Sequence, residues 1–263
     1  MIKRDIKVFG GGGKGQTPVA SSATPSNIDE IGKPAVHLIS GATGVGKSNV
    51  ARNMVEAYYD AHAKARTKPA PDILVYTGAS GDPVWEGGSK RVKMYGPQTA
   101  SDFVDEVNRR YDRAIRAKTA PTADPSVEGS GVPKADEYED DDKHKPTMVV
   151  VDDAGASELF PAQMFRSPIA QAIQSHRHSD MSFIISSQRY HSHNPWLRSN
   201  AATVNVFPPK GSEETNFLKR DLPIPQEALR RGFAVASANG KHNFISVDTR
   251  ERVATHGFSG HAI

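Results

Sequence analysis

The segment GATGVGKS at residues 41–48 constrains this chain more than any other part of its sequence. It satisfies the pattern G-x-x-x-x-G-K-[ST], in which a glycine-rich turn wraps its backbone N–H groups around phosphate oxygens. The pattern is informative only between a strand and a helix, and both flanks fit. An apolar run, AVHLIS, precedes it at 35–40, and residues 47–66 follow it with apolar side chains at helical spacing. We therefore expect a strand, a phosphate-binding loop and a helix in direct succession.

The residues of this segment have distinct expected tasks. Backbone N–H groups from Thr43 to Lys47 would surround the phosphates, and the N-terminus of the following helix adds a favourable dipole. Lys47 would reach the β- and γ-phosphates, and the Ser48 hydroxyl would ligate Mg²⁺. The predicted nucleotide-binding residues are Gly41, Thr43, Gly44, Val45, Gly46, Lys47, Ser48 and Asn49. A similar phrase, GGGGKGQT at 10–17, lacks the Ser or Thr after its lysine and no strand precedes it, so we expect a linker there.

Two adjacent aspartates follow the apolar run MVVV at 148–151. Asp152 is expected to bind Mg²⁺ through water, and Asp153 to polarise the water that attacks the γ-phosphate. A loop-capping aspartate is the alternative for this position. Another apolar run, MSFIISS at 181–187, ends at Gln188. Its side-chain amide could sense the γ-phosphate or orient the attacking water.

Hydrophobic periodicity predicts the fold class. Strands are expected at 35–40, 72–78, 147–153, 181–188 and 201–208, and helices at 47–66, from about Ser101, and at roughly 161–175. This alternation indicates an α/β fold of the P-loop NTPase type, with a mostly parallel sheet flanked by helices. Two short helices, at 213–220 and 225–231, come next. The segments GFAVAS and HNFISVD, on either side of Asn239 and Gly240, predict a small C-terminal β-hairpin.

Composition divides the chain into an arm, a domain and an insertion. Residues 1–33 contain a run of four glycines and no apolar period, which predicts a flexible N-terminal arm. Residues 34–263 would form the ATPase domain, with a disordered acidic insertion at about 117–146. No apolar run approaches the ~18 residues of a membrane span, and the N-terminus lacks a secretory signal. We therefore expect a soluble protein that is not secreted.

Charge and cysteine content limit the possible partners. The stretch DEYEDDDKHK at 136–145 has six acids and two bases, a net charge of −4. Because the whole chain carries +3, the rest of it carries +7. This surplus fits a polyanionic partner and equally fits a mildly basic enzyme. The absence of cysteine excludes disulfides and thiolate metal sites.

Three segments together give a resemblance to a known family. They are GATGVGKS, MVVVDD and SHRHSDMSFIISSQRYHSHNPWLRSN, the last at 175–200. From about Ala35 to Pro208 the chain resembles the packaging-ATPase branch of the FtsK/HerA superfamily, the DNA-packaging motors of giant, poxvirus-like and membrane-containing icosahedral viruses. The resemblance implies an ATP- and Mg²⁺-dependent translocase of double-stranded DNA that works as a homo-oligomeric ring, usually a hexamer. It also implies capsid vertex or portal proteins as partners, and a location in the virion or at the assembly site in the host cytoplasm.

The resemblance further implies an arginine supplied by a neighbouring subunit. Arg177 precedes Gln188 by eleven residues, a spacing similar to that of the FtsK motor, and is the first candidate for this trans-acting finger. Arg198 is the second candidate, and for either arginine a surface salt bridge is the alternative. The Asp152-Asp153 pair departs from the commoner Asp-Glu pair of such motors, which leaves the identity of the base less secure.

Two further patterns allow more than one interpretation. Histidines 176, 178, 191 and 193 form two H-x-H pairs, which suggest a zinc site but more often contact solvent or DNA phosphates. The segment KRVKMYG at 90–96 either lines a pore and touches DNA or is a solvated surface loop.

Other classes of protein share the phosphate loop. A small-molecule kinase needs an arginine-rich lid, and the only long insertion here is acidic near its end. A regulatory GTPase needs an N-K-x-D motif, which the chain lacks. A structural subunit that binds nucleotide without hydrolysing it also stays open, and would show ATP binding without turnover even on DNA.

Overall fold

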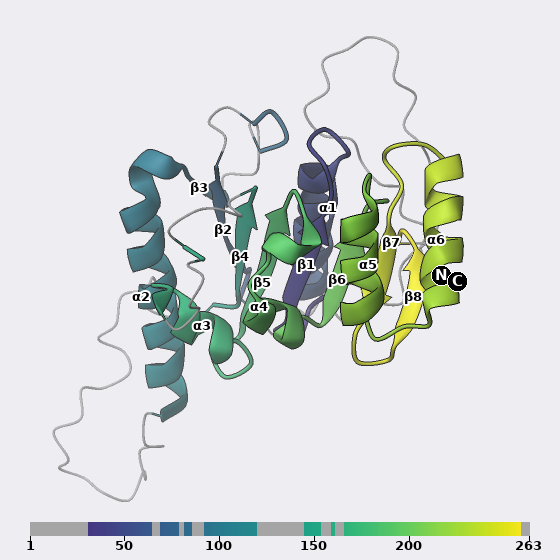
Figure 1. Ribbon diagram of the computed structural model, residues 1–263. Helices are drawn as coiled ribbons and strands as arrows, with labels where there is room; N and C mark the ends of the chain where they lie inside the picture. Colours follow the sequence, from purple (N-terminus) through teal and green to yellow (C-terminus); the bar gives the residue numbers. More distant parts are fainter. Residues whose placement is uncertain are drawn as a thin grey trace, which may run out of the picture.

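Within the part of the chain that the structure describes, eight strands form a single sheet in the order β3-β2-β4-β5-β1-β6-β7-β8 (Figure 1). Pairing is parallel from β3 to β6 and antiparallel from β6 to β8. The strands are β1 (Val36–Ser40), β2 (Asp72–Thr77), β3 (Val92–Tyr95), β4 (Thr147–Asp152), β5 (Met181–Ser187), β6 (Thr203–Val206), β7 (Ile245–Asp248) and β8 (Val253–His256). The predicted α/β class and mostly parallel sheet are confirmed.

The computed structural model describes residues 31–64, 69–78, 82–85, 92–119, 145–153, 159–160 and 166–258. Most of the predicted N-terminal arm and of the predicted acidic insertion lies outside these ranges. The helices are α1 (Lys47–Lys64), α2 (Ala100–Thr119), α3 (Ala170–Gln174), α4 (Pro195–Asn200), α5 (Ser212–Asp221) and α6 (Gln226–Ala238). Among the described helices, none is long and apolar enough to cross a bilayer.

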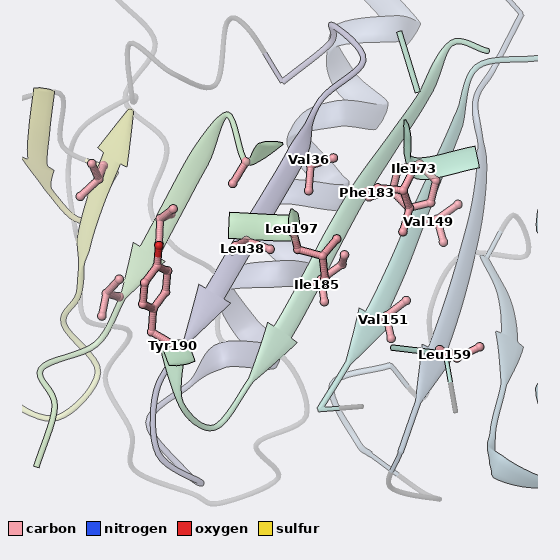
Figure 2. Packing of buried hydrophobic residues seen from close by; sticks show 14 of the residues in the cluster. Val36, Leu38, Val149, Val151, Leu159, Ile173, Phe183, Ile185, Tyr190 and Leu197 are labelled. Atoms are coloured by element: carbon pink, nitrogen blue, oxygen red, sulfur yellow. The ribbon is translucent and has the colours of Figure 1, made fainter. Parts of the chain in front are cut away.

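The central strands are apolar on both faces because each face is covered. In β4, Val149 and Val151 belong to one core, and Met148 and Val150 to the other. The first core lies under α2 to α6, and Figure 2 shows Val149 and Val151 beside Phe183 and Ile185 of β5. The second core packs against α1, which lies behind the sheet in Figure 1. Burial on both faces explains the unbroken apolar runs that predicted these strands.

The structure corrects two predicted elements. KRVKMYG is not simply a loop: Val92–Tyr95 is β3, which pairs in parallel with β2 at the edge of the sheet. Its edge position leaves Lys93 and Met94 exposed, so no apolar pattern marks it. GFAVAS is not a strand, because residues 226–238 form one helix. Leu229, Phe233 and Ala236 recur every three or four residues and are buried on one helix face.

Two further elements differ in extent. The predicted C-terminal hairpin exists, but it is built from β7 and β8 and extends the main sheet. In the region predicted as a helix at 161–175, the structure describes α3 over residues 170–174 only. Residues 161–165 lie outside the described ranges.

The order β4-β5-β1-β6 determines where polar groups meet. Parallel strands present all their carboxyl ends at one edge of the sheet, so the loops after β1, β4 and β5 are neighbours there. These three loops contain residues 41–46, Asp153 and Gln188. The amino ends of the same strands form the opposite edge.

Candidate nucleotide-binding site

The loop from Gly41 to Gly46 joins β1 directly to α1, as the sequence predicts. The Gly41 N–H donates to the carbonyl of Ser187, the last residue of β5, at 3.2 Å. A Cβ atom at Gly41 would lie 2.8 Å from the side chain of Phe207, so a side chain does not fit there without displacing its neighbours. Gly44 and Gly46 have φ angles of +77° and +108°, which glycine adopts at little cost. The shape of this loop therefore requires glycine at positions 41, 44 and 46.

The N-terminus of α1 follows this loop directly. The helix begins at Lys47 and continues for 18 residues, which gives its first turn a positive dipole end. Ser48 and Asn49 lie on that first turn and are partly buried. Thr43 and Gly44 are exposed at the tip of the loop. Such a combination of loop N–H groups and a helix N-terminus is an anion-binding arrangement.

Lys47 is buried and bends back over the loop. Its side chain is 6% exposed, and Nζ lies 3.4 Å from the Ala42 carbonyl oxygen. Nζ is also 3.9 Å from Oδ1 of Asp153. The ammonium group therefore lies between the phosphate loop and the end of β4, where it can meet a phosphate bound to the loop.

The two aspartates after the apolar run occupy different environments. Asp152 is 1% exposed and accepts a hydrogen bond on each oxygen, from the Ser186 hydroxyl on Oδ1 and from the Trp85 indole N–H, at 2.8 Å, on Oδ2. Asp153 is about one third exposed and has a left-handed backbone with φ of +53°. Its N–H donates to the Ser186 hydroxyl oxygen at 2.8 Å. Ser186 thus connects the two residues and fixes the turn between them.

Gly78 supports this turn from the neighbouring strand. Its N–H donates to the Asp152 carbonyl at 3.1 Å, directly after β2 ends. A Cβ atom there would lie 3.0 Å from the Asp153 carbonyl oxygen. The close approach of two backbones at this point favours glycine.

Gln188 completes the cluster at the carboxyl edge. Its amide nitrogen lies 3.4 Å from Oδ2 of Asp153, while Lys47 approaches Oδ1 of the same carboxylate. The structure therefore brings together Lys47, Asp153 and Gln188, which the sequence separates by 141 positions at most.

Three residues of this site were not predicted. Trp85 holds Asp152, as described above. His242, from the turn between α6 and β7, donates Nδ1–H to the Val45 carbonyl at 2.9 Å and so connects the C-terminal part of the sheet to the phosphate loop.

His193 is the third, and it lies beneath the loop. It is 3% exposed, and its Nε2 lies 3.0 Å from the Ser40 hydroxyl and 2.9 Å from the Ser187 hydroxyl. These serines end β1 and β5, so one ring connects the strands that carry Gly41 and Gln188. Burial lowers the pKa of His193 to about 4, and the ring is neutral at pH 7. The H-x-H pattern that contains His193 does not indicate that this ring connects β1 and β5.

The two candidate finger arginines lie away from this cluster. Arg177 is exposed on the turn between α3 and β5, at the amino edge of the sheet. Arg198 pairs with Asp221, Nε to Oδ2, at 2.7 Å, and its guanidinium lies 4.8 Å from the centre of the Phe217 ring. The salt-bridge alternative is thus observed for Arg198.

The histidines do not assemble a zinc site. His176 and His178 are on the turn at the amino edge, and His191 and His193 follow β5 at the carboxyl edge. Within the described ranges, no three or more His, Asp or Glu residues are grouped to hold a metal ion.

A hard cation fits the oxygen groups near the loop. Mg²⁺ commonly takes one or two protein oxygens and completes its shell with water and phosphate. Asp152 has both oxygens engaged by hydrogen bonds from Ser186 and Trp85, which suits contact with a metal ion through water. The Ser48 hydroxyl is the second oxygen group expected to face it.

A cavity of about 420 Å³ opens next to the phosphate loop. Its wall includes the start of the loop, the segment after β5 and the segment from Val206 to Gly211, with Glu213 and Glu214 at the start of α5. This volume falls within the range of roughly 300–1,000 Å³ of small-molecule sites. The cavity is continuous with the loop, so it can receive the remainder of a ligand whose phosphates lie on the loop.

Comparison with known proteins identifies solved structures of the same fold. No protein-family model and no curated protein matches the sequence. The DNA-packaging ATPase B204 of Sulfolobus turreted icosahedral virus matches with a TM-score of 0.57 at 14% identity, over 86% of this chain and 98% of that one. B204 of Sulfolobus turreted icosahedral virus 2, in complex with AMP, matches with a TM-score of 0.52 at 14% identity, over 85% of this chain and 96% of that one. ATPases 2 and 3 of EssC from Geobacillus thermodenitrificans match with a TM-score of 0.52 at 14% identity, over 86% of this chain and 39% of that one. The fold implied by the resemblance is confirmed.

Proposed function

We propose that this chain is an ATPase of the packaging branch of the FtsK/HerA superfamily, a motor that drives double-stranded DNA into a viral capsid. The observation that carries the proposal is the meeting of Lys47, Asp153 and Gln188 beside a phosphate loop on the fold of packaging NTPases. Structures of B204 of Sulfolobus turreted icosahedral virus 2 with ATP-gammaS and with AMPPCP support ATP as the nucleotide.

Each residue contributes one step to hydrolysis. The loop N–H groups of residues 43–47 bind and orient the phosphates, and Lys47 neutralises charge on the β- and γ-phosphates. Asp153 accepts the proton of the attacking water, while Gln188 holds that water or the γ-phosphate in line. Bound Mg²⁺, held by Ser48 and through water by Asp152, would neutralise charge that develops on the phosphate oxygens.

A ring of subunits would supply the remaining positive charge. Arg177 is exposed and forms no ion pair with any described residue, so its guanidinium is available to a neighbour. A head-to-tail ring apposes different surfaces of adjacent subunits, which allows an arginine from one to reach a nucleotide on the next. Arg198 ranks second because Asp221 already holds it. Capsid vertex or portal proteins, and a location in the virion or at the assembly site, complete this proposal.

Two other functions are less well supported. A small-molecule kinase would need an arginine-rich lid over the cavity beside the loop. The lining of that cavity has two acids, Glu213 and Glu214, against two bases, Arg189 and Lys210. A subunit that binds nucleotide without turnover would not need Asp153 and Gln188 to approach each other at the loop. Neither alternative accounts for the whole cluster.

DNA-stimulated ATP hydrolysis tests the proposal. Double-stranded DNA should raise the turnover rate of the wild-type protein under conditions that permit assembly. Lys47→Ala should abolish turnover with and without DNA and keep the circular dichroism spectrum of the wild type. Turnover that DNA fails to raise would favour the kinase or the binding subunit.

A further inference from the structure

A second and larger cavity, of about 550 Å³, lies at the amino edge of the sheet. Its walls come from the turn between α3 and β5, the end of α4, the end of α5 with the segment after it, the turn between β7 and β8, and the side of Tyr190, which follows β5. It shares no lining residue with the cavity beside the phosphate loop. Thr203, the first residue of β6, pairs with Asp248, the last of β7, so the turn after β7 lies at this same edge. The seven residues of β5 place this edge roughly 20 Å from the phosphate loop. The cavity is therefore separate from the candidate nucleotide site.

Three arginines from distant parts of the chain line this cavity. Arg177 lies on the first of these turns, Arg198 on α4 and Arg250 on the turn after β7. One acid, Asp221, lines it as well and is paired with Arg198. Three arginines and one aspartate give the lining a net charge of +2 with its histidines neutral. Within the described ranges, the guanidinium groups of Arg177 and Arg250 form no ion pair.

His176 adds a buried polar group without a partner. The side chain is 6% exposed and lines the cavity. Its Nδ1–H donates to the Ile173 carbonyl at 2.8 Å, while Nε2 is buried and has no hydrogen-bond partner among the described residues. Buried polar atoms are satisfied in the large majority of cases. With the proton on Nδ1, Nε2 is an acceptor, which water or the hydroxyl of a protonated phosphate monoester would satisfy. Burial lowers the pKa of His176, and the charges of Arg177 and Arg250 lower it further.

We propose that this cavity is a phosphate-binding pocket, in which Arg177 and Arg250 hold the oxygens of a phosphodiester or of a phosphate monoester. Guanidinium groups bind phosphate through paired, charge-assisted hydrogen bonds, and two uncommitted arginines at one cavity can bind one phosphate group from two sides. The exposed His178 adds a further donor at the rim. The ligand is either the backbone of a nucleic acid or a small phosphate compound. With a nucleic acid as the ligand, the inference rests on the proposed function and shares Arg177 with it. Arg250 has no assigned part in hydrolysis, so a variant at that position keeps the two tests distinguishable.

Arg250→Gln tests the pocket, and Arg252→Gln is its matched control. Arg252 lies on the same turn and is exposed, but it does not line the cavity. The two full-length variants and the wild type are compared by fluorescence anisotropy with labelled duplex DNA at several salt concentrations, and by calorimetric titration with pyrophosphate. Thermal unfolding and DNA-free ATP turnover should equal those of the wild type in both variants.

We expect Arg250→Gln to weaken DNA binding about tenfold and to reduce the slope of log affinity against log salt by about one, with less than a twofold effect of Arg252→Gln. That result identifies the nucleic acid backbone as the ligand. A loss of pyrophosphate binding in Arg250→Gln alone, with DNA affinity unchanged, supports the pocket with a small phosphate ligand. Equal effects of the two variants, or no effect of Arg250→Gln on either probe, would overturn the proposal.

Discussion

Asp152 and Asp153 are adjacent, yet their side chains have opposite environments. Asp152 is buried and held by Ser186 and Trp85, whereas Asp153 is exposed toward Lys47 and Gln188. Asp153→Asn should therefore bind Mg-ATP but hydrolyse it about 10²- to 10⁴-fold more slowly, because the general base is lost. Asp152→Asn should weaken nucleotide binding only when Mg²⁺ is present. Nucleotide titrations with and without Mg²⁺ check both, and identical behaviour of the two variants would refute the assignment of separate roles.

Two buried neutral histidines predict how stability depends on pH. Burial lowers the pKa of His37 and of His193 to about 4, from 6.5 in the unfolded chain. The unfolded state therefore binds more protons between pH 6.5 and 4, so stability is full above about pH 6.5 and is lost as the pH falls. Between pH 6.5 and 5 the loss should be on the order of 2 kcal/mol for each histidine.

Urea unfolding at pH 7.5, 6 and 5 measures this dependence. His193→Gln should flatten the loss of unfolding free energy toward pH 5, because one of the buried histidines whose pKa is lowered by folding is gone. The exposed His178, changed to Gln, is the control and should leave the slope as in the wild type. If the unfolding free energy of His193→Gln fell with pH as steeply as that of the wild type, the buried, neutral state of this ring would be contradicted.

At the level of single residues, the sequence predicted the groups that carry a motif. The phosphate loop, the aspartate pair and Gln188 follow apolar strands, and this local signal located them. Trp85, His193 and His242 have no such signal, because their roles depend on contacts across 67, 153 and 197 positions of sequence. Arg198 was a finger candidate because nothing in the sequence shows that Asp221 lies next to it.

At the level of elements, the turn from β1 into α1 makes a sharp prediction. Gly41 lies against Phe207, with no room for a side chain, whereas Gly211 in the wall of the same cavity has no atom within 4 Å of its Cβ position. Gly41→Ala should therefore displace the loop and weaken ATP binding about tenfold or more, while Gly211→Ala should bind ATP like the wild type. Calorimetric titration with ATP compares the two, and equal affinity would show that Gly41 is not needed for the shape of the loop.

Elements buried on both faces were predicted well, and elements at the edges were not. β1, β2, β4 and β5 contribute apolar residues to both cores because both sides of the sheet are covered, whereas β6 contributes Val204 and Val206 to the first core. β3 is an edge strand with exposed Lys93, and its pattern is that of a loop. The sequence of α6 suggests a helix followed by a strand because Phe233 and the β-branched Val235 are residue types that favour strands. Its packing on β7 and β8 favours the helix.

At the level of the whole molecule, the proposed ring makes one site from two subunits. Arg177→Ala and Asp153→Asn should each lack turnover but bind ATP. Mixing them should restore partial activity, since one type of mixed interface has an intact Asp153 in one subunit and an intact Arg177 in the next. Turnover of the mixture, measured against each variant alone at the same total concentration, checks this. A mixture as inactive as its components would remove Arg177 from the trans role, and Arg198→Ala in its place would test the second candidate.

Displacement of a third strand from a DNA triplex measures translocation itself. A labelled oligonucleotide bound at one end of a long duplex is released only when a motor moves along the duplex and reaches it. Wild-type protein with ATP and Mg²⁺ should release this strand, and neither Lys47→Ala nor the wild type with a non-hydrolysable analogue should do so. ATP hydrolysis at full rate without release of the strand would contradict the account of this chain as a DNA-translocating motor.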